Sequence, residues 1–151
     1  MIQKTKQITV FLENKPGRLA TVLSQLAHAR VNIVALSVMD KTERGVLRLV
    51  TENGTKAGQI IQGLNTPVTE TDVLLVELRN QPGALAHVCE VLAADHINIE
   101  YAYCSSGGRN GKVFGIFKVS NVDKATRVLS ESPNSRRLER RPMRDQRAYR
   151  K

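Results

Sequence analysis

The chain carries the same short pattern twice, at a fixed separation. The segment from Glu13 to Ala20, ENKPGRLA, returns 66 positions later at Arg79 to Ala86 as RNQPGALA. The tripeptide VNI at 31–33 returns at the same separation as INI at 97–99. The similarity then resumes after a loop that is two residues longer in the second copy. Such a repeat means that the chain is built from two copies of one folding unit.

The repeat divides the chain into two domains and a tail. We predict a first domain at residues 1–70, a second at residues 71–140 and a basic tail at residues 141–151. The hydrophobic fraction of 41% and the charged fraction of 25% are typical of a globular protein with a packed core. Because a domain of about 65 residues buries only a marginal core by itself, we expect the copies to pair in one sheet and to unfold together.

Each copy begins with a strand, a tight turn and a helix. The β-rich runs Ile8–Leu12 and Val73–Leu78 are each stopped by Asn-x-Pro-Gly, in which Pro fixes φ for the first turn position and Gly tolerates a positive φ at the second. Apolar residues then recur at helical spacing, which predicts helices near 18–30 and 84–95. They are Leu19, Val22, Leu23 and Leu26, matched by Leu85, Val88, Cys89 and Leu92.

The rest of each copy reads as two more strands, a helix and a last strand. Second strands are expected at 33–39 and 99–104, third strands at 45–51 and 112–119, and second helices near 55–64 and 122–131, capped by Asn53 or Thr55 and by Asn121. Residues 68–71 would form the fourth strand of the first copy. In the second copy the corresponding strand is expected at 135–141. This segment has one apolar residue and would form at best a charged edge strand. The fold class is therefore α+β: two tandem βαββαβ, ferredoxin-like modules, with antiparallel sheets side by side and helices on one face.

The two Asn-x-Pro-Gly-x-Leu motifs, each followed at the same distance by an Asn-Ile that opens a strand, resemble the ACT domain family. These are small ligand-sensing modules attached to enzymes of amino-acid metabolism and also found as free-standing tandem proteins. The first copy is also similar to the amino-terminal module of acetolactate synthase regulatory subunits, which share its Leu-Glu-Asn-x-x-Gly start. The resemblance implies paired modules with an amino acid held at their interface.

The resemblance also implies which residues bind the ligand. The matching positions are Asn14, Pro16, Gly17, Arg18, Leu19 and Asn32 in the first copy, and Asn80, Pro82, Gly83, Ala84, Leu85 and Asn98 in the second. A Gly at the start of a helix lets free backbone N–H groups approach a carboxylate, and an Asn amide both donates and accepts. We expect Asn14 with Asn32 to contact one amino acid and Asn80 with Asn98 another. The alternative is that these Asn residues only cap turns.

The ligand itself stays open at this stage. Serine-sensing members of the family carry a histidine two residues before the first Asn, where this chain has Leu12 and Leu78, so serine is in doubt and the side-chain pocket is apolar. The copies also differ, because Arg18 corresponds to Ala84. Two unequal sites, or one site and one relic, both fit.

Several other classes of protein find little support. No Ser-His-Asp or Cys-His arrangement and no phosphate-binding Gly-rich loop can be argued from spacing, so we expect no enzyme and no cofactor. His87, Cys89, His96 and Cys104 lack the spacing of a metal site. Tyr101 and Tyr103 share one face of a strand, where core or dimer packing is favoured over a ligand platform. No apolar run has the length of a signal peptide or a membrane span, and we expect a cytoplasmic protein.

The sequence thus predicts a non-catalytic sensor of amino-acid metabolism that binds a free amino acid or a related small metabolite, and we expect a homodimer. Two alternatives concern its partner. The net charge is +9, and residues 131–151 hold eight basic residues against three acidic ones, so the tail could serve a ligand-responsive regulator that binds nucleic acid. No helix-turn-helix pattern accompanies it, which disfavours that role. The chain could instead be the regulatory subunit of a separate biosynthetic enzyme.

Overall fold

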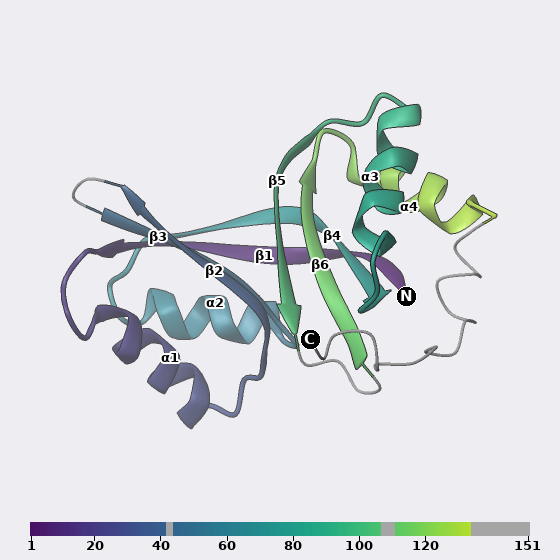
Figure 1. Cartoon of the computed structure of the whole chain (residues 1–151). Helices are drawn as coiled ribbons and strands as arrows, with labels where there is room; N and C mark the ends of the chain where they lie inside the picture. The colour runs from purple at the N-terminus through teal and green to yellow at the C-terminus, as the bar shows by residue number, and fades with distance from the viewer. Residues whose placement is uncertain (42–43, 107–110, 134–151) are drawn as a thin grey trace, which may run out of the picture.

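Two long strands in the middle of the molecule join the two copies into one sheet (Figure 1). The computed structural model describes residues 1–41, 44–106 and 111–133. Within this part, six strands form an antiparallel sheet in the order β2-β3-β1-β4-β6-β5. The elements are β1 (Ile2–Glu13), α1 (Arg18–His28), β2 (Ile33–Lys41), β3 (Arg44–Thr51), α2 (Gly54–Gln62), β4 (Val68–Arg79), α3 (Ala84–Ala94), β5 (Ile99–Ser106), β6 (Lys112–Val119) and α4 (Val122–Glu131).

The fourth strand of the first copy and the first strand of the second copy are one continuous strand. β4 has 12 residues and pairs with β1 from Val10↔Val68 to Ile2↔Val76. Its first residues complete the sheet of the first copy, and the strand then runs on without a break into the second copy. The expected division between residues 70 and 71 therefore falls inside a strand that both copies share.

The beginning of β1 stands where a fourth strand of the second copy is needed. Ile2 pairs with Val76, and Thr5 pairs with Val73. Ile2 also packs against the core of the second copy, and Lys4 Nζ lies 3.2 Å from Asp123 Oδ1 on α4. The segment that we predicted for this strand, 135–141, lies outside the described residues. Sequence reasoning missed the beginning of β1 because residues 3–6 are polar or charged and show no apolar alternation.

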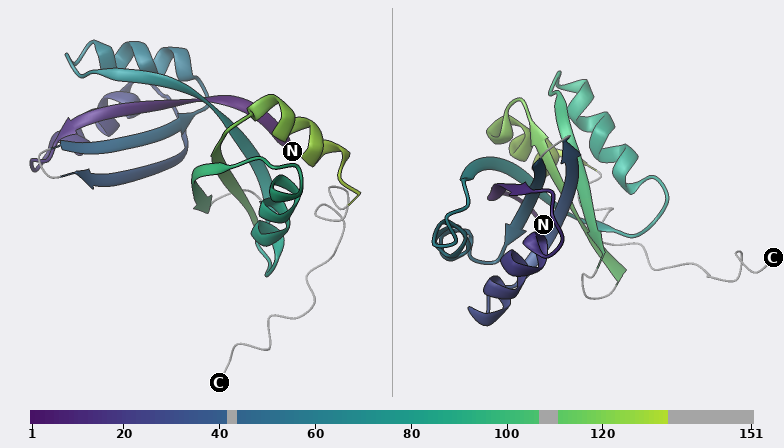
Figure 2. Two further views of the ribbon diagram at one scale, coloured as in Figure 1. Left: turned by 90° about the horizontal axis from the view of Figure 1, so that it is seen from above. Right: turned by 90° about the vertical axis from the view of Figure 1, so that its left-hand side faces the viewer.

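All four helices cover the same face of the sheet, as predicted (Figures 1 and 2). Directly paired residues of antiparallel strands point to the same face, and the pairs Val10↔Val68 and Lys4↔Leu74 place the helix-facing positions of both copies on one side. The first core contains Ile8, Val10, Leu12, Val22, Leu26, Val31, Leu47, Leu49, Ala57 and Ile61. The second contains Leu74, Val76, Leu78, Ala84, Val88, Leu92, Ile97, Phe117, Val119, Ala125 and Leu129. None of the described helices is both long and apolar enough to cross a lipid bilayer.

The helix-free face of the sheet coils around a third, smaller core. The two edge strands, β2 and β5, come close to each other, and Figure 2 shows how strongly the sheet twists between the copies. Between them lies an apolar cluster formed by Ala35, Val50, Val73, Leu75 and Ile116. These residues come from both copies, so burying them requires that both are present.

A polar cluster beside this third core ties β1 to β5. Gln7 is fully buried, and its Nε2 donates hydrogen bonds to the Tyr101 hydroxyl at 2.7 Å and to Thr9 Oγ1 at 3.1 Å. The Tyr103 hydroxyl donates to Gln7 Oε1 at 2.8 Å. The guanidinium of Arg48 stacks on the Tyr101 ring, 3.9 Å from its centroid. The two tyrosines therefore pack within the fold, which is the role the sequence favoured for them.

The Tyr103 hydroxyl gives the cluster a pH dependence. Burial, with a smaller contribution from the neighbouring Tyr101, raises the pKa of Tyr103 above the ordinary value of 10.0, although Arg48 opposes the shift. Above pH 10 the unfolded chain releases this proton while the folded chain retains it, so the free energy of unfolding must fall as the pH rises. The slope of the free energy of unfolding against pH cannot exceed about 1.4 kcal/mol per pH unit, which is the limit for one proton. The slope stays below this limit because Tyr103 is partly exposed and solvent screens its charge.

We therefore expect the urea midpoint of the chain to fall more steeply between pH 10 and pH 11.5 than the midpoint of a Tyr103→Phe variant. Every other group is present in both proteins, so its contribution cancels in this comparison. Equal slopes for the two proteins would show that the Tyr103 hydroxyl is not held neutral by the fold.

Candidate functional site

The two Asn-x-Pro-Gly segments form matching turns at the ends of β1 and β4. In each turn the Gly is the residue before the helix and has a left-handed backbone, with φ 88° at Gly17 and φ 87° at Gly83. Residues with a Cβ rarely adopt this conformation, which is why the motif needs Gly there. The positive φ that the sequence predicted at both positions is confirmed.

The helices that follow these turns begin without a side-chain cap. The cap residue of each is a Gly, so within the described residues no capping side chain accepts a hydrogen bond from the first turn of α1 or α3, and a Cβ placed on Gly17 or Gly83 would meet nothing within 4 Å. By contrast, α2 and α4 have the predicted caps, because Asn53 and Asn121 accept hydrogen bonds from the backbone N–H groups three residues on, those of Lys56 and Lys124. In α1 and α3 the first N–H groups, those of Arg18 and Ala84, donate to the Lys15 and Gln81 carbonyls at 3.3 Å, and the positive end of each helix dipole lies beside the turn, where it favours an anion.

Asn14 and Asn32 do not come together within the first copy. Asn14 Nδ2 donates to Asp40 Oδ1 at 3.3 Å near the end of β2, and Asn32 Nδ2 donates to Glu52 Oε1 at 3.0 Å at the opposite end. The part of β2 from Ile33 to Asp40 separates them, about 23 Å at 3.3 Å per residue. One amino acid therefore does not reach both side chains in a single copy, and our expectation of such a joint site has to be corrected.

The second copy repeats this separation. The Asn80 N–H donates to the Gly111 carbonyl at 3.1 Å, where β4 ends. The Asn98 N–H donates to Ser120 Oγ at 3.1 Å, where β5 begins. The strands β4 and β5 run parallel to each other on either side of β6, so the end of one and the start of the other lie at opposite ends of the sheet. Asn80 and Asn98 therefore do not share a ligand within one copy either.

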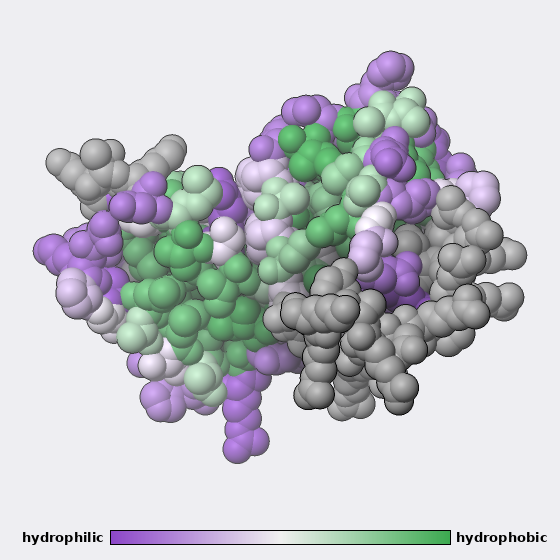
Figure 3. Space-filling model, in the orientation of Figure 1, coloured by the Kyte–Doolittle hydropathy of each residue, from purple (hydrophilic) through white to green (hydrophobic). Residues whose placement is uncertain are grey.

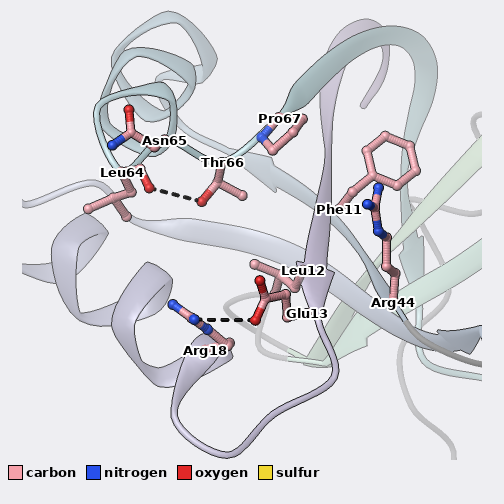
Figure 4. A pocket seen from close by; sticks show the side chains of 9 residues that line it. All are labelled: Phe11, Leu12, Glu13, Arg18, Arg44, Leu64, Asn65, Thr66 and Pro67. Carbon is pink, nitrogen blue, oxygen red and sulfur yellow. Dashed lines mark hydrogen bonds and ion pairs between the residues drawn. The ribbon is translucent and has the colours of Figure 1, made fainter.

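A cavity of about 360 Å³ opens beside the first turn, between the end of β1, the start of α1 and the α2–β4 connection (Figure 4). Of the residues that we predicted to bind the ligand, only Arg18 lines it. Leu19 instead packs against the first core. The lining residues are Phe11, Leu12, Glu13, Arg18, Arg44, Leu64, Asn65, Thr66 and Pro67.

The cavity holds two guanidinium groups and one carboxylate. Arg18 Nη2 lies 3.3 Å from Glu13 Oε2, and Lys15 Nζ lies 3.2 Å from the same oxygen. Lys15 and, to a smaller degree, Arg18 lower the pKa of Glu13, so this carboxylate is ionised at neutral pH. The Arg44 guanidinium makes no hydrogen bond or ion pair with any described residue. The cavity thus presents groups for a carboxylate and for an ammonium, and its apolar lining comes from Phe11, Leu12 and Leu64.

The second copy lacks this set of charges. The position of Arg18 is taken by Ala84, which is buried in the second core. The sheet register places Lys112 where the first copy has Arg44, and Lys112 is ion-paired with Glu77. Leu85, the match of Leu19, is exposed. The two copies are therefore chemically unequal at their turns, as the exchange of Arg18 for Ala84 already indicated.

Sequence reasoning missed most of the cavity. Arg44 and the segment Leu64–Pro67 are far from the turn in the sequence, and only the fold brings them to it. The one signal in the sequence was the difference between Arg18 and Ala84, which marks the first copy as the more polar of the two. Among the described residues no three His, Cys, Asp or Glu side chains gather as a metal site would require.

Comparisons with known proteins place this chain in a family. A family model described as an ACT domain pair matches residues 3–137. Protein BT0572 from Bacteroides thetaiotaomicron has 36% sequence identity and a TM-score of 0.77, over 86% of this chain and 89% of that one. No protein of curated function matches the sequence.

Two more distant structures share the fold. The ligand-free regulatory subunit of aspartate kinase from Thermus thermophilus has 13% identity and a TM-score of 0.62, over 85% of this chain and 96% of that one. The corresponding subunit from Thermus flavus has 15% identity and a TM-score of 0.57, over 86% of this chain and 95% of that one. From the family model, the relative at 36% identity and the shared fold, we conclude that this chain belongs to the ACT domain pair family of regulatory, ligand-binding proteins.

Proposed function

We propose that the chain is a non-catalytic sensor that binds a free α-amino acid in the cavity of the first copy. The observation that carries this proposal is that Arg18, Arg44 and Glu13 all line about 360 Å³ of space beside the first Asn-x-Pro-Gly turn. A guanidinium suits the ligand's α-carboxylate, the Glu13 carboxylate suits its ammonium, and the apolar wall suits its side chain. From the sequence we expected a site at the interface between the two copies, whereas the site proposed here lies within the first copy.

The other predicted binding residues have more indirect parts in this proposal. Asn14, Pro16 and Gly17 form the turn that presents Arg18, and the open start of α1 adds a positive partial charge beside it. The turn of Asn80, Pro82 and Gly83 is a second, weaker site, because it has the same open helix start without the arginines.

We also propose a homodimer. The edge strand β2 exposes Leu36, Val38 and Met39, with exposed fractions of 39%, 50% and 45%. Apolar residues gather on this side of the first copy (Figure 3), and an exposed apolar patch on an edge strand favours pairing with another chain. Asn32 can join a ligand at Asn14 only from such a second chain, because the two side chains lie at opposite ends of β2 within one chain.

The partner of the sensor is a separate enzyme in this proposal. The two Thermus proteins are regulatory subunits of aspartate kinase, and their likeness to nearly the whole of this chain supports a role in which the ACT pair acts on another polypeptide. The nucleic-acid alternative rests on the basic segment 134–151. This segment lies outside the described residues, so the structure gives that alternative no support.

The proposal predicts that at least one amino acid raises the melting temperature and that Arg18→Ala weakens its binding. A ligand at ~100 times its dissociation constant adds roughly 2.7 kcal/mol to the free energy of unfolding, which a thermal-shift screen of the common amino acids detects. A hydrogen bond to a charged group contributes roughly 1.5 to 3 kcal/mol. Because the Arg18 side chain is 56% exposed, we expect the lower end of that range, a loss of about tenfold in affinity.

Arg127→Ala is the matched control, because it removes one exposed arginine from α4 in the second copy and should leave the affinity unchanged. If no amino acid shifts the melting temperature, the chain is not a sensor of free amino acids. If both variants bind equally well, the ligand binds elsewhere than in the cavity.

A further inference from the structure

We infer that the ligand of the first copy is an amino acid with an acidic side chain, and that Arg44 recognises the side-chain carboxylate. This inference rests on the proposed function and adds the chemical class of the ligand. It follows from the charges around the cavity, from an Arg44 guanidinium that has no partner among the described residues, and from the size of the space.

The charges around the cavity favour a ligand with a net negative charge. Arg18 and Arg44 bring two positive charges to the lining, and Glu13 brings one negative charge. A neutral zwitterion would leave this excess of positive charge uncompensated, whereas a dicarboxylic amino acid carries two carboxylates and one ammonium and balances it. Charge complementarity of this kind determines which of several similar ligands a site prefers.

The two arginines have different surroundings, which gives them different roles. Arg18 is held by Glu13 at 3.3 Å, and together they match the adjacent carboxylate and ammonium of an α-amino acid. Arg44 comes from the first residue of β3, and Figure 4 shows it beside Phe11, away from the Arg18–Glu13 pair. Its guanidinium has no partner among the described residues. A planar guanidinium of this kind binds a carboxylate through two parallel hydrogen bonds.

The space that these residues line suits a small ligand. A volume of about 360 Å³ lies near the lower end of the range for small-molecule sites, about 300 to 1,000 Å³. Phe11 and Leu64 line the cavity between polar groups, where they can cover the methylene groups of an acidic side chain. In the second copy Lys112 is ion-paired with Glu77 and Ala84 replaces Arg18, so only the first copy offers a cation for each carboxylate.

The test compares acidic amino acids with their neutral amides on the full chain. Binding of L-aspartate and L-glutamate is measured by calorimetry against L-asparagine and L-glutamine, at one pH and ionic strength, for the unchanged chain and for Arg44→Gln and Arg18→Ala. We expect the unchanged chain to prefer an acid over its amide at least tenfold. Arg44→Gln should abolish this preference by weakening binding of the acid far more than binding of the amide, whereas Arg18→Ala should weaken acid and amide alike.

The outcomes separate this inference from the function on which it rests. If none of the common amino acids binds, the proposed function fails. If the amides or other neutral amino acids bind as tightly as the acids, the sensor stands but the acidic ligand is wrong. If Arg44→Gln still prefers the acid over the amide, another residue recognises the side-chain carboxylate, and this outcome also overturns the inference. Arg44→Lys, which retains the charge without the planar fork, should retain part of the preference and serves as the second variant if Arg44→Gln folds poorly.

Discussion

A chain that ends at Glu70 will not form a stable monomer. It retains the first core, but it loses most of β4 and with it the partner of residues 2–7 of β1. It also uncovers the helix-free face, where Gln7 and Val50 are buried only because β4, β5 and β6 cover them. What is left is a module of about 70 residues with one exposed sheet face, and the core of so small a unit is marginal.

Urea unfolding followed by circular dichroism, with the molecular mass from light scattering, tests this expectation. The truncated chain should show no cooperative transition as a monomer. A chain that ends at Pro133 is the matched control, because the charged tail has no amphipathic pattern that would pack on the fold, and its urea midpoint should equal that of the full chain. A monomeric chain ending at Glu70 that is as stable as the full chain would refute the interdependence of the two copies.

Much of this fold could be predicted because the repeat supplied every element twice. Periodicity located the four helices and the strands facing them, and the Asn caps at positions 53 and 121 were read from spacing alone. The beginning of β1 escaped prediction for a physical reason. Its polar residues sit where the copies join, so their place is decided by pairing with β4 and not by an apolar pattern of their own.

The candidate site was less predictable than the fold. The turn geometry follows from Pro and Gly, and the sequence therefore located the two turns correctly. The residues that surround Arg18 are determined by which loops the fold brings to that turn. The sequence around Arg44 and around Leu64 contains no pattern that predicts this proximity. The joint use of Asn14 and Asn32 failed because both lie at strand ends, and the sequence alone did not show that these are opposite ends of the sheet.

Replacing Gln7 should cost more stability than any other single polar change on the sheet. Gln7→Leu removes its hydrogen bonds to Thr9, Tyr101 and Tyr103, each worth about 1 kcal/mol net, and leaves two phenol groups without their partner. We expect a loss of about 2 to 4 kcal/mol in the free energy of unfolding, measured by urea denaturation. Gln3→Leu, an exposed change on the same face of β1, is the control and should stay within about 0.5 kcal/mol.

The combined variant Gln7→Leu, Tyr101→Phe and Tyr103→Phe tests the origin of this loss of stability. The loss comes either from the hydrogen bonds that are removed or from the tyrosine hydroxyls that are left buried without a partner. Replacing both partners of a buried hydrogen bond by apolar groups removes the penalty of unsatisfied atoms, so this triple variant should be more stable than Gln7→Leu alone. The pseudo-symmetric positions already have such packing, because Val73 and Ala35 correspond to Gln7 and Tyr101 and are buried in the third core. Additive losses across the three changes would mean that the side chains act independently, and that the contact between β1 and β5 does not depend on this cluster.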